Sequence, residues 1–182
     1  MRGIHFRALM SLAEERFGPE VVEQMLDRAG GSRRGAYTTV GFYPPEEFLA
    51  LAEALSDLTG QTRQTILFSC GRRVYAYLRV TQVKDRPPPP DILSALRSIA
   101  SILQASYKKL HNDAVLPSIE VEAGRGGRVD LIYRSPRPMA DFAEGLVHEA
   151  LAPLQADCRI DRLDLPPFDG RAARFRVTPR RR

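Results

Sequence analysis

A tyrosine, a serine and an arginine stand at alternate positions of the segment Tyr133-Arg134-Ser135-Pro136-Arg137. In an extended segment, alternate side chains project to the same side of the backbone. Two hydroxyl groups would then lie beside a guanidinium, whose planar fork suits the bidentate recognition of a carboxylate. The segment therefore predicts either a carboxylate-binding site, or a tyrosine in the core and an arginine paired with a local acid.

Few other residues have the types or the spacing of a catalytic or metal site. The two cysteines, Cys70 and Cys158, lie far apart and show no metal-ligand spacing, so we expect reduced thiols. The three histidines are His5, His111 and His148. No serine stands in a nucleophile-elbow context, and no glycine-rich phosphate loop is present. The sequence therefore does not indicate an enzyme.

The composition is that of an ordinary globular chain. Of the 182 residues, 43% are hydrophobic and 27% are charged, and the net charge is +5. The excess arginines stand in a C-terminal run and in isolated pairs rather than among aromatic residues, which favours a solvated surface over a nucleic-acid site. No segment is apolar enough to cross a bilayer, and no signal peptide opens the chain. We expect a cytoplasmic protein with no nucleic-acid and no membrane partner.

The elements before residue 90 are predicted to be helices. Apolar residues recur at three- and four-residue steps over 4–29, and Gly18-Pro19 divides this segment into two helices. A further helix is expected over 48–58. Thr62 is placed to cap the next helix, which Gly71 would end.

The pattern changes in the second half. Residues 74–83 give no clear prediction, and Pro87 to Pro90 form an extended connection. Asp91 is placed to cap a helix whose apolar stripe runs from Ile92 to Leu110.

Two hairpins are expected after this helix. Alternating apolar residues flank a turn at Gly124 to Gly127, and a second hairpin is centred on 166–170, with a helix over 142–154 between them. The class is α+β, an N-terminal helical half followed by a C-terminal antiparallel sheet of two hairpins packed with a long helix. We expect one domain over 1–182, with a helical subregion over about 1–86, the connection 87–90, and a helix plus sheet over about 91–178.

The chain resembles the haem-nitric-oxide/oxygen-binding (H-NOX) family. The resemblance covers nearly the whole sequence, and segment 133–137 matches the family's Tyr-x-Ser-x-Arg signature. It is carried also by Met1-Arg2-Gly3-Ile4, Arg16-Phe17-Gly18, Tyr43 to Gly60, Gly71, Met139, Phe142 and Gly145-Leu146. The resemblance implies an H-NOX-like fold in which Tyr133, Ser135 and Arg137 bind the propionates of a haem cofactor.

The family's iron ligand is missing. A histidine on the long helix before the first hairpin normally ligates the iron from the proximal side, and counting back from Pro117-Ser118 places that position at Gln104. Glutamine is not a usual haem ligand. His111 lies about two helical turns, roughly 10 Å, further along, which is too far to replace it.

His5 stands where the resemblance places an apolar side chain on the gas-binding side of the haem. A histidine there would ligate iron from the opposite face or hydrogen-bond to a bound ligand. The alternative is an imidazole ring that lies in solvent or forms a hydrogen bond with the backbone.

The resemblance implies a stand-alone sensory or regulatory domain with a haem-type pocket and atypical ligation, Gln104 replacing the proximal histidine and His5 a candidate ligand. A diatomic gas would be its ligand, and its partner a separate signalling protein such as a histidine kinase or a cyclic-nucleotide enzyme. The alternative is a haem-free relative that acts as a protein-interaction module or binds a small apolar carboxylate through Arg137.

Overall fold

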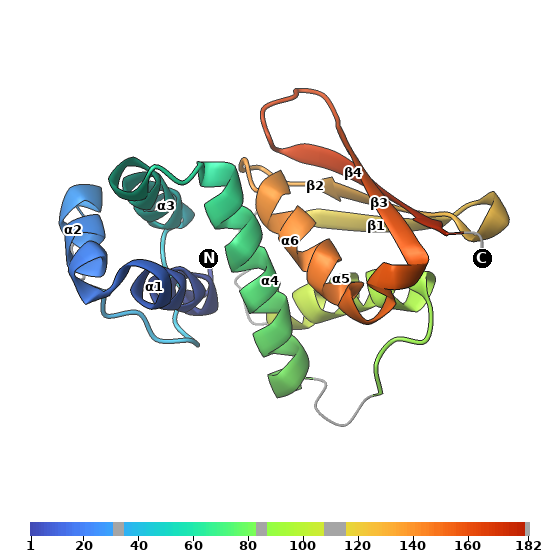
Figure 1. Ribbon diagram of the computed structural model, residues 1–182, viewed down its shortest axis with the longest axis horizontal. Helices are drawn as coiled ribbons and strands as arrows, with labels where there is room; N and C mark the ends of the chain where they lie inside the picture. Colours follow the sequence, from blue (N-terminus) through green and yellow to red (C-terminus); the bar gives the residue numbers. More distant parts are fainter. Residues whose placement is uncertain (31–34, 83–86, 108–115, 181–182) are drawn as a thin grey trace.

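The computed structural model describes residues 1–30, 35–82, 87–107 and 116–180, without the side chains of 82, 104–107 and 155–156. Helices form the first part, and a sheet with two helices forms the second (Figure 1). The helices of the first part are α1 (Gly3–Phe17), α2 (Pro19–Ala29), α3 (Pro45–Thr59) and α4 (Arg63–Gln82). The second part contains α5 (Ile92–Tyr107), β1 (Ser118–Ala123), β2 (Val129–Arg134), α6 (Ala140–Ala150), β3 (Cys158–Asp164) and β4 (Ala172–Pro179).

The division of the first helical segment at Gly18-Pro19 is confirmed. Gly18 adopts a φ of 87°, which a residue with a side chain rarely adopts, and its N–H donates to the Glu14 carbonyl at 2.9 Å. Pro19 then begins α2 at a position where a missing N–H costs no helical hydrogen bond. The local conformations of Gly18 and Pro19 therefore account for the change in chain direction between α1 and α2.

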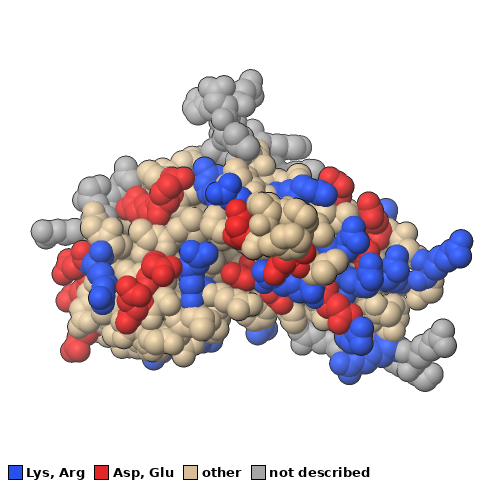
Figure 2. Space-filling model, turned by 90° about the horizontal axis from the view of Figure 1, so that it is seen from above, with Lys and Arg blue, Asp and Glu red and all other residues tan. Residues whose placement is uncertain are grey.

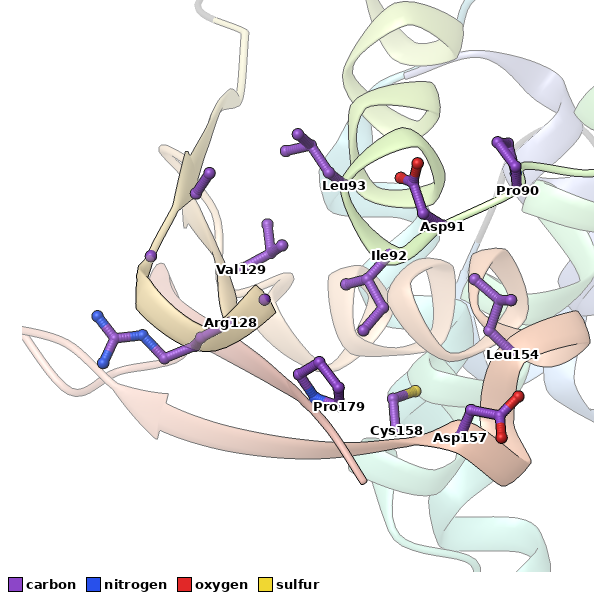
Figure 3. A pocket seen from close by; sticks show the side chains of 13 residues that line it. Pro90, Asp91, Ile92, Leu93, Arg128, Val129, Leu154, Asp157, Cys158 and Pro179 are labelled. Atoms are coloured by element: carbon purple, nitrogen blue, oxygen red, sulfur yellow. The ribbon is translucent and has the colours of Figure 1, made fainter. Parts of the chain in front are cut away.

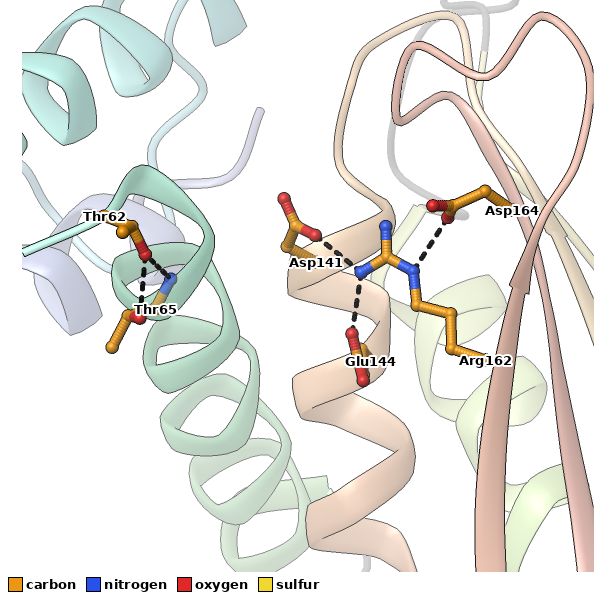
Figure 4. A network of polar contacts seen from close by, with 6 residues as sticks. All are labelled: Thr62, Thr65, Asp141, Glu144, Arg162 and Asp164. Carbon is orange, nitrogen blue, oxygen red and sulfur yellow. Dashed lines mark hydrogen bonds and ion pairs between the residues drawn. The ribbon is translucent and has the colours of Figure 1, made fainter.

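The predicted end of a helix at Gly71 is wrong, because α4 continues through Gly71 to Gln82. Thr62 does cap this helix, its hydroxyl oxygen accepting from the Thr65 N–H at 3.2 Å (Figure 4). A Cβ at Gly71 would lie 2.0 Å from the carbonyl oxygen of Phe142 on α6. The glycine is therefore needed for the close approach of two helices and does not end one.

The strands form an antiparallel sheet in the order β1-β2-β4-β3, which confirms both predicted hairpins and the α+β class. Helices α5 and α6 lie against one face of this sheet (Figure 1). Leu131 and Tyr133 of β2 are buried and stand opposite Phe175 and Ala173 of β4. Helix α6 ends earlier than predicted, and a 3-10 helix (Ala152–Asp157) follows, because Pro153 cannot donate to a continuing α-helix.

The buried side chains of both parts form one hydrophobic cluster. It includes Phe6 and Phe48 from the helical part, and Phe142 and Phe175 from α6 and the sheet. A core shared by the two parts is consistent with a single domain. Its expected bounds, 1–182, stay a prediction.

Positive and negative side chains are interspersed on the face shown in Figure 2. This face therefore does not form one continuous basic surface. Within the part of the chain that the structure describes, no helix is long and apolar enough to span a membrane.

Arg162 of β3 forms ion pairs with three carboxylates, of which Asp141 and Glu144 lie on α6 and Asp164 lies on β3 itself (Figure 4). Its Nη1 lies 2.6 Å from Asp141 and 2.7 Å from Glu144, and its Nε lies 2.8 Å from Asp164. Only 17% of its side chain is exposed. Replacing Arg162 by methionine should lower the free energy of unfolding by about 2–3 kcal/mol, because it leaves shielded carboxylates unpaired. Urea denaturation would measure this.

The matched control adds Asp141→Asn and Glu144→Gln to Arg162→Met. Removing the unpaired charges should recover most of the lost stability. A triple variant as unstable as Arg162→Met alone would show that the methylene stem of Arg162, and not its charge, stabilises this contact.

Candidate functional site

Segment 133–137 does not remain extended, because β2 ends at Arg134. Of the three signature residues, Tyr133 lies on the strand and the other two follow it. The Tyr133 side chain lies in the core, with 4% of the residue exposed. The Ser135 N–H donates to the Arg171 carbonyl at 2.8 Å, and its hydroxyl oxygen accepts from the Arg137 N–H at 3.1 Å. The predicted projection of all three side chains to one side of an extended backbone is therefore wrong beyond Arg134, where a turn begins.

Arg137 reaches α3 across this turn. Its Nε lies 3.5 Å from a carboxylate oxygen of Glu46, whose side chain is 73% exposed, so the pair is loose and solvated. The amino group of Met1 is nearby: burial, and then the charge of Arg137, lower its pKa. Arg137 is thus paired only loosely with one exposed carboxylate and lies near a second cationic group, and this positive charge suits an anionic ligand.

His5 of α1 is buried, with 4% exposed. Its Nδ1 lies 2.9 Å from the Arg2 carbonyl oxygen, so Nδ1 carries the proton and Nε2 carries the lone pair. The ring centroid lies 5.2 Å from that of Phe142 on α6 and 6.3 Å from that of Phe48 on α3. Burial lowers the pKa of His5 to about 4, so the ring is neutral at pH 7.

The pKa of His5 predicts a pH dependence of stability. An unfolded chain protonates this histidine below about pH 6.5, whereas the folded chain protonates it only near pH 4. The stabilisation is therefore complete above pH 6.5 and is lost as the pH falls to 4. Relative to His5→Leu, wild type should lose roughly 3 kcal/mol of unfolding free energy between pH 7 and pH 4.

Chemical denaturation of the two cofactor-free proteins at a series of pH values measures this difference. The other titratable groups are the same in both proteins. The difference between their unfolding free energies at each pH therefore reports the contribution of His5. A difference in stability that stays constant over this range would contradict the burial of a neutral imidazole.

The remaining sequence-predicted residues are placed only in part. Gln104 lies in α5, but its side chain is outside the described residues, as is all of His111. His148 of α6 lies against Phe68 of α4, with ring centroids 5.1 Å apart. Cys70 and Cys158 are free and buried, as expected. Among the described residues, no group of histidine, cysteine and acidic side chains has the arrangement of a metal site.

The first turn of α3 brings His5 and Arg137 into one neighbourhood. Phe48 contacts the imidazole and Glu46 contacts the guanidinium, while Phe142 of α6 covers His5 from another side. Sequence reasoning missed the roles of these three residues. The signature segment and α3 are 91 residues apart at the Arg137–Glu46 contact, and no local pattern connects them.

The imidazole of His5 and the guanidinium of Arg137 are groups of the chemical types that hold a haem. A neutral imidazole whose Nδ1 is oriented by a backbone carbonyl is a usual iron ligand, and a guanidinium suits a propionate. Because only 4% of His5 is exposed, an iron atom reaches Nε2 only if the side chains packed against the ring move.

Comparison with known proteins identifies the fold and the family. The family model described as Haem-NO-binding (HNOB) matches residues 2–161. The chain is similar to an Fe(II) unliganded H-NOX protein from K. algicida, with 25% identity, a TM-score of 0.85, and coverage of 100% of this chain and 98% of that one. No curated protein matches the chain in sequence.

Two further solved structures share the fold at lower identity. An H-NOX protein from S. oneidensis in the Fe(II)NO ligation state has 21% identity and a TM-score of 0.82, with 100% of both chains covered. A single-substitution mutant of T. tengcongensis H-NOX has 16% identity and a TM-score of 0.82, with 100% of this chain and 98% of that one covered. On the match to the family model, this chain belongs to the haem-NO-binding (H-NOX) family of sensor domains.

Proposed function

We propose that this chain is a haem-holding sensor domain in which His5, and not the residue at position 104, ligates the iron. The observation that carries this proposal is the state of the imidazole. Its Nδ1 proton is held by the Arg2 carbonyl, so that Nε2 keeps its lone pair inside an apolar enclosure. Gln104 offers only an amide, which is a poor iron ligand.

The neighbouring residues bind and orient the cofactor. Arg137 pairs with a propionate in place of the exposed Glu46. Tyr133 and Ser135 are further candidates for propionate binding only through the family resemblance. Phe142 and Phe48 exclude water from the imidazole. A bound haem supplies an iron centre for a diatomic gas.

The chain's own residues also suggest how the state of the pocket reaches the surface. Admitting a ligand at His5 displaces Phe142, which lies in the first turn of α6 between Asp141 and Glu144. Those two carboxylates hold Arg162 of β3, so a shift of α6 changes the β3 contact. The signal then passes to a separate signalling protein, such as a histidine kinase or a cyclic-nucleotide enzyme, in the cytoplasm.

The burial of His5 favours a second candidate function. With 4% of the ring exposed, protein side chains already fill the space around it. A haem-free relative that binds a small apolar carboxylate through Arg137, or that acts as a protein-interaction module, needs no iron at this position. Gln104 is consistent with this candidate.

A haemin titration of the purified apoprotein distinguishes the two. We expect a saturable Soret band at one haem per chain. Arg137→Gln should weaken binding by about tenfold, corresponding to one charge-assisted hydrogen bond of about 1.5 kcal/mol. Arg134→Gln, a neighbouring arginine with 54% of its side chain exposed, is the matched control and should bind as wild type does. Absence of a saturable band would refute the haem proposal and favour the haem-free candidate.

A further inference from the structure

Strand β3 forms one edge of the sheet. The order β1-β2-β4-β3 gives it a single neighbour, β4, and among the residues that the structure describes no other strand pairs with it. Its pairing with β4 is regular from Cys158 to Asp164, without a bulge, and the strand contains no proline. Bulges and prolines are devices by which natural edge strands avoid pairing with another chain. The free edge of β3 is therefore open to a further strand.

The hydrogen bonds at the two ends of β3 show which of its backbone groups are free. The Leu165 N–H donates to the Ala172 carbonyl at 3.0 Å, and the Asp157 carbonyl accepts from the Arg180 N–H at 2.7 Å. In an antiparallel pair, alternate residues turn both backbone groups to the partner strand, and the residues between them turn theirs away. The odd-numbered residues of β3 therefore bond to β4, whereas the N–H and C=O groups of its even-numbered residues point to the free edge.

The side chains of β3 alternate between the two faces of the sheet. Cys158 lies beside Ile92 and Leu154 in an aliphatic hollow at the end of the sheet (Figure 3), and Arg162 is paired with carboxylates of α6 (Figure 4). Ile160 stands between them and is half-buried against the core. The even-numbered side chains thus lie on the face that the helices cover, and the odd-numbered ones lie on the open face.

Arg159 and Asp161 place opposite charges on this open face. The Arg159 Nη2 lies 2.7 Å from an Asp161 carboxylate oxygen, and the side chains are 70% and 43% exposed. When a second copy of β3 runs antiparallel with Ile160 opposite Ile160, Arg159 of each copy stands opposite Asp161 of the other. The four charges then alternate in sign around a square, and the isoleucines meet on the other face. Opposite charges that face each other across two strands stabilise their pairing.

The alternatives lack this complementarity. Moving the centre of the pairing by one residue in either direction places Asp161 opposite Asp161, or Arg159 opposite Arg159, and like charges there are destabilising. The other edge strand, β1, has Glu120 and Glu122 as its only charged residues, so two copies of it would bring glutamates together. The charge pattern therefore favours β3 and one register.

We propose that two copies of this chain associate through antiparallel pairing of their β3 edges, in the register that places Ile160 opposite Ile160. The two four-stranded sheets join as one continuous sheet. The contact is isologous, since the same residues of both copies form it. It is short, so the dimer is weak and its population depends on protein concentration. None of these residues belongs to the proposed haem site, and the inference does not depend on haem binding.

Sedimentation velocity of the purified protein, from about 10 µM to about 1 mM, tests the proposal in the range of a weak interface. Wild type should show a reversible equilibrium between monomer and dimer. Arg159→Asp and Asp161→Arg should each weaken dimerisation by about tenfold or more, because two attractive pairs become two repulsive ones. An equimolar mixture of these two variants should dimerise at least as strongly as wild type, because their reversed charges complement each other. Arg125→Asp, at an exposed position of the β1–β2 turn, is the matched control and should dimerise as wild type does.

Amide hydrogen exchange, measured by nuclear magnetic resonance at low and high protein concentration, locates the contact. The amides of Ile160 and Arg162 should become protected as the dimer forms, whereas those of Arg159 and Asp161, which bond to β4, should be protected at both concentrations. A wild type that stays monomeric over this range would overturn the proposal. So would a mixture no more associated than its two components, or a dimer in which the Ile160 amide stays unprotected.

Discussion

Replacing Gly145 by alanine is expected to lower the free energy of unfolding by about 3–4 kcal/mol, at the severe end of overpacking substitutions. A Cβ at this position would lie 2.0 Å from the carbonyl oxygen of Phe68 on α4. The obstacle is backbone, so no side-chain rotation relieves it. The two helices must separate, and the packing of α6 on α4 is lost along its length.

Urea denaturation of Gly145→Ala, beside Gln64→Ala as control, measures this effect. Gln64 is exposed on α4, so its replacement should change stability by no more than about 0.5 kcal/mol. Gly71→Ala should resemble Gly145→Ala, because its Cβ meets the Phe142 carbonyl oxygen equally closely. The double variant should cost less than the sum, because one separation relieves both contacts. A Gly145→Ala protein as stable as wild type would contradict this helix crossing.

Replacing Gln104 by histidine would offer the iron of a bound haem a second histidine besides His5, the proposed ligand. The family resemblance implies that position 104 and His5 would hold the iron from opposite sides. The ferric protein should therefore become six-coordinate and low-spin, and haem should bind at least about tenfold more tightly, or about 1.4 kcal/mol. The absorption spectrum and electron paramagnetic resonance report the spin state directly.

Gln104→Ala is the matched control, and it should leave the spectrum of the wild-type complex unchanged. A Gln104→His protein that also carries His5→Leu should return to a single histidine ligand. A Gln104→His complex whose spin state is unaffected by His5→Leu would contradict the placement of His5 at the iron.

Much of the fold was predictable because its signals are local. The turn at Gly18-Pro19, the cap at Asp91 and the glycine-rich turn after β1 each depend on a few adjacent residues. Gly71 was not predictable in the same way. A glycine near the middle of an amphipathic segment usually indicates a helix end, and only the carbonyl of Phe142, far along the chain, explains why a helix keeps it.

The candidate site was predictable by residue type but not by geometry. Segment 133–137 was identified from its composition, yet Ser135 turns the chain and bonds to the backbone of Arg137. The contacts of His5 depend on Phe48 and Phe142, which lie on separate helices. Such tertiary proximity leaves no periodic signal in the sequence, and the haem ligand set stays a proposal.

The spectrum of haemin-loaded wild type beside that of haemin-loaded His5→Leu tests the central claim most directly. If His5 ligates the iron, wild type shows a histidine-ligated Soret band and ferric paramagnetic signal, and His5→Leu loses both while its circular dichroism is retained. Identical spectra from the two proteins would contradict ligation by His5.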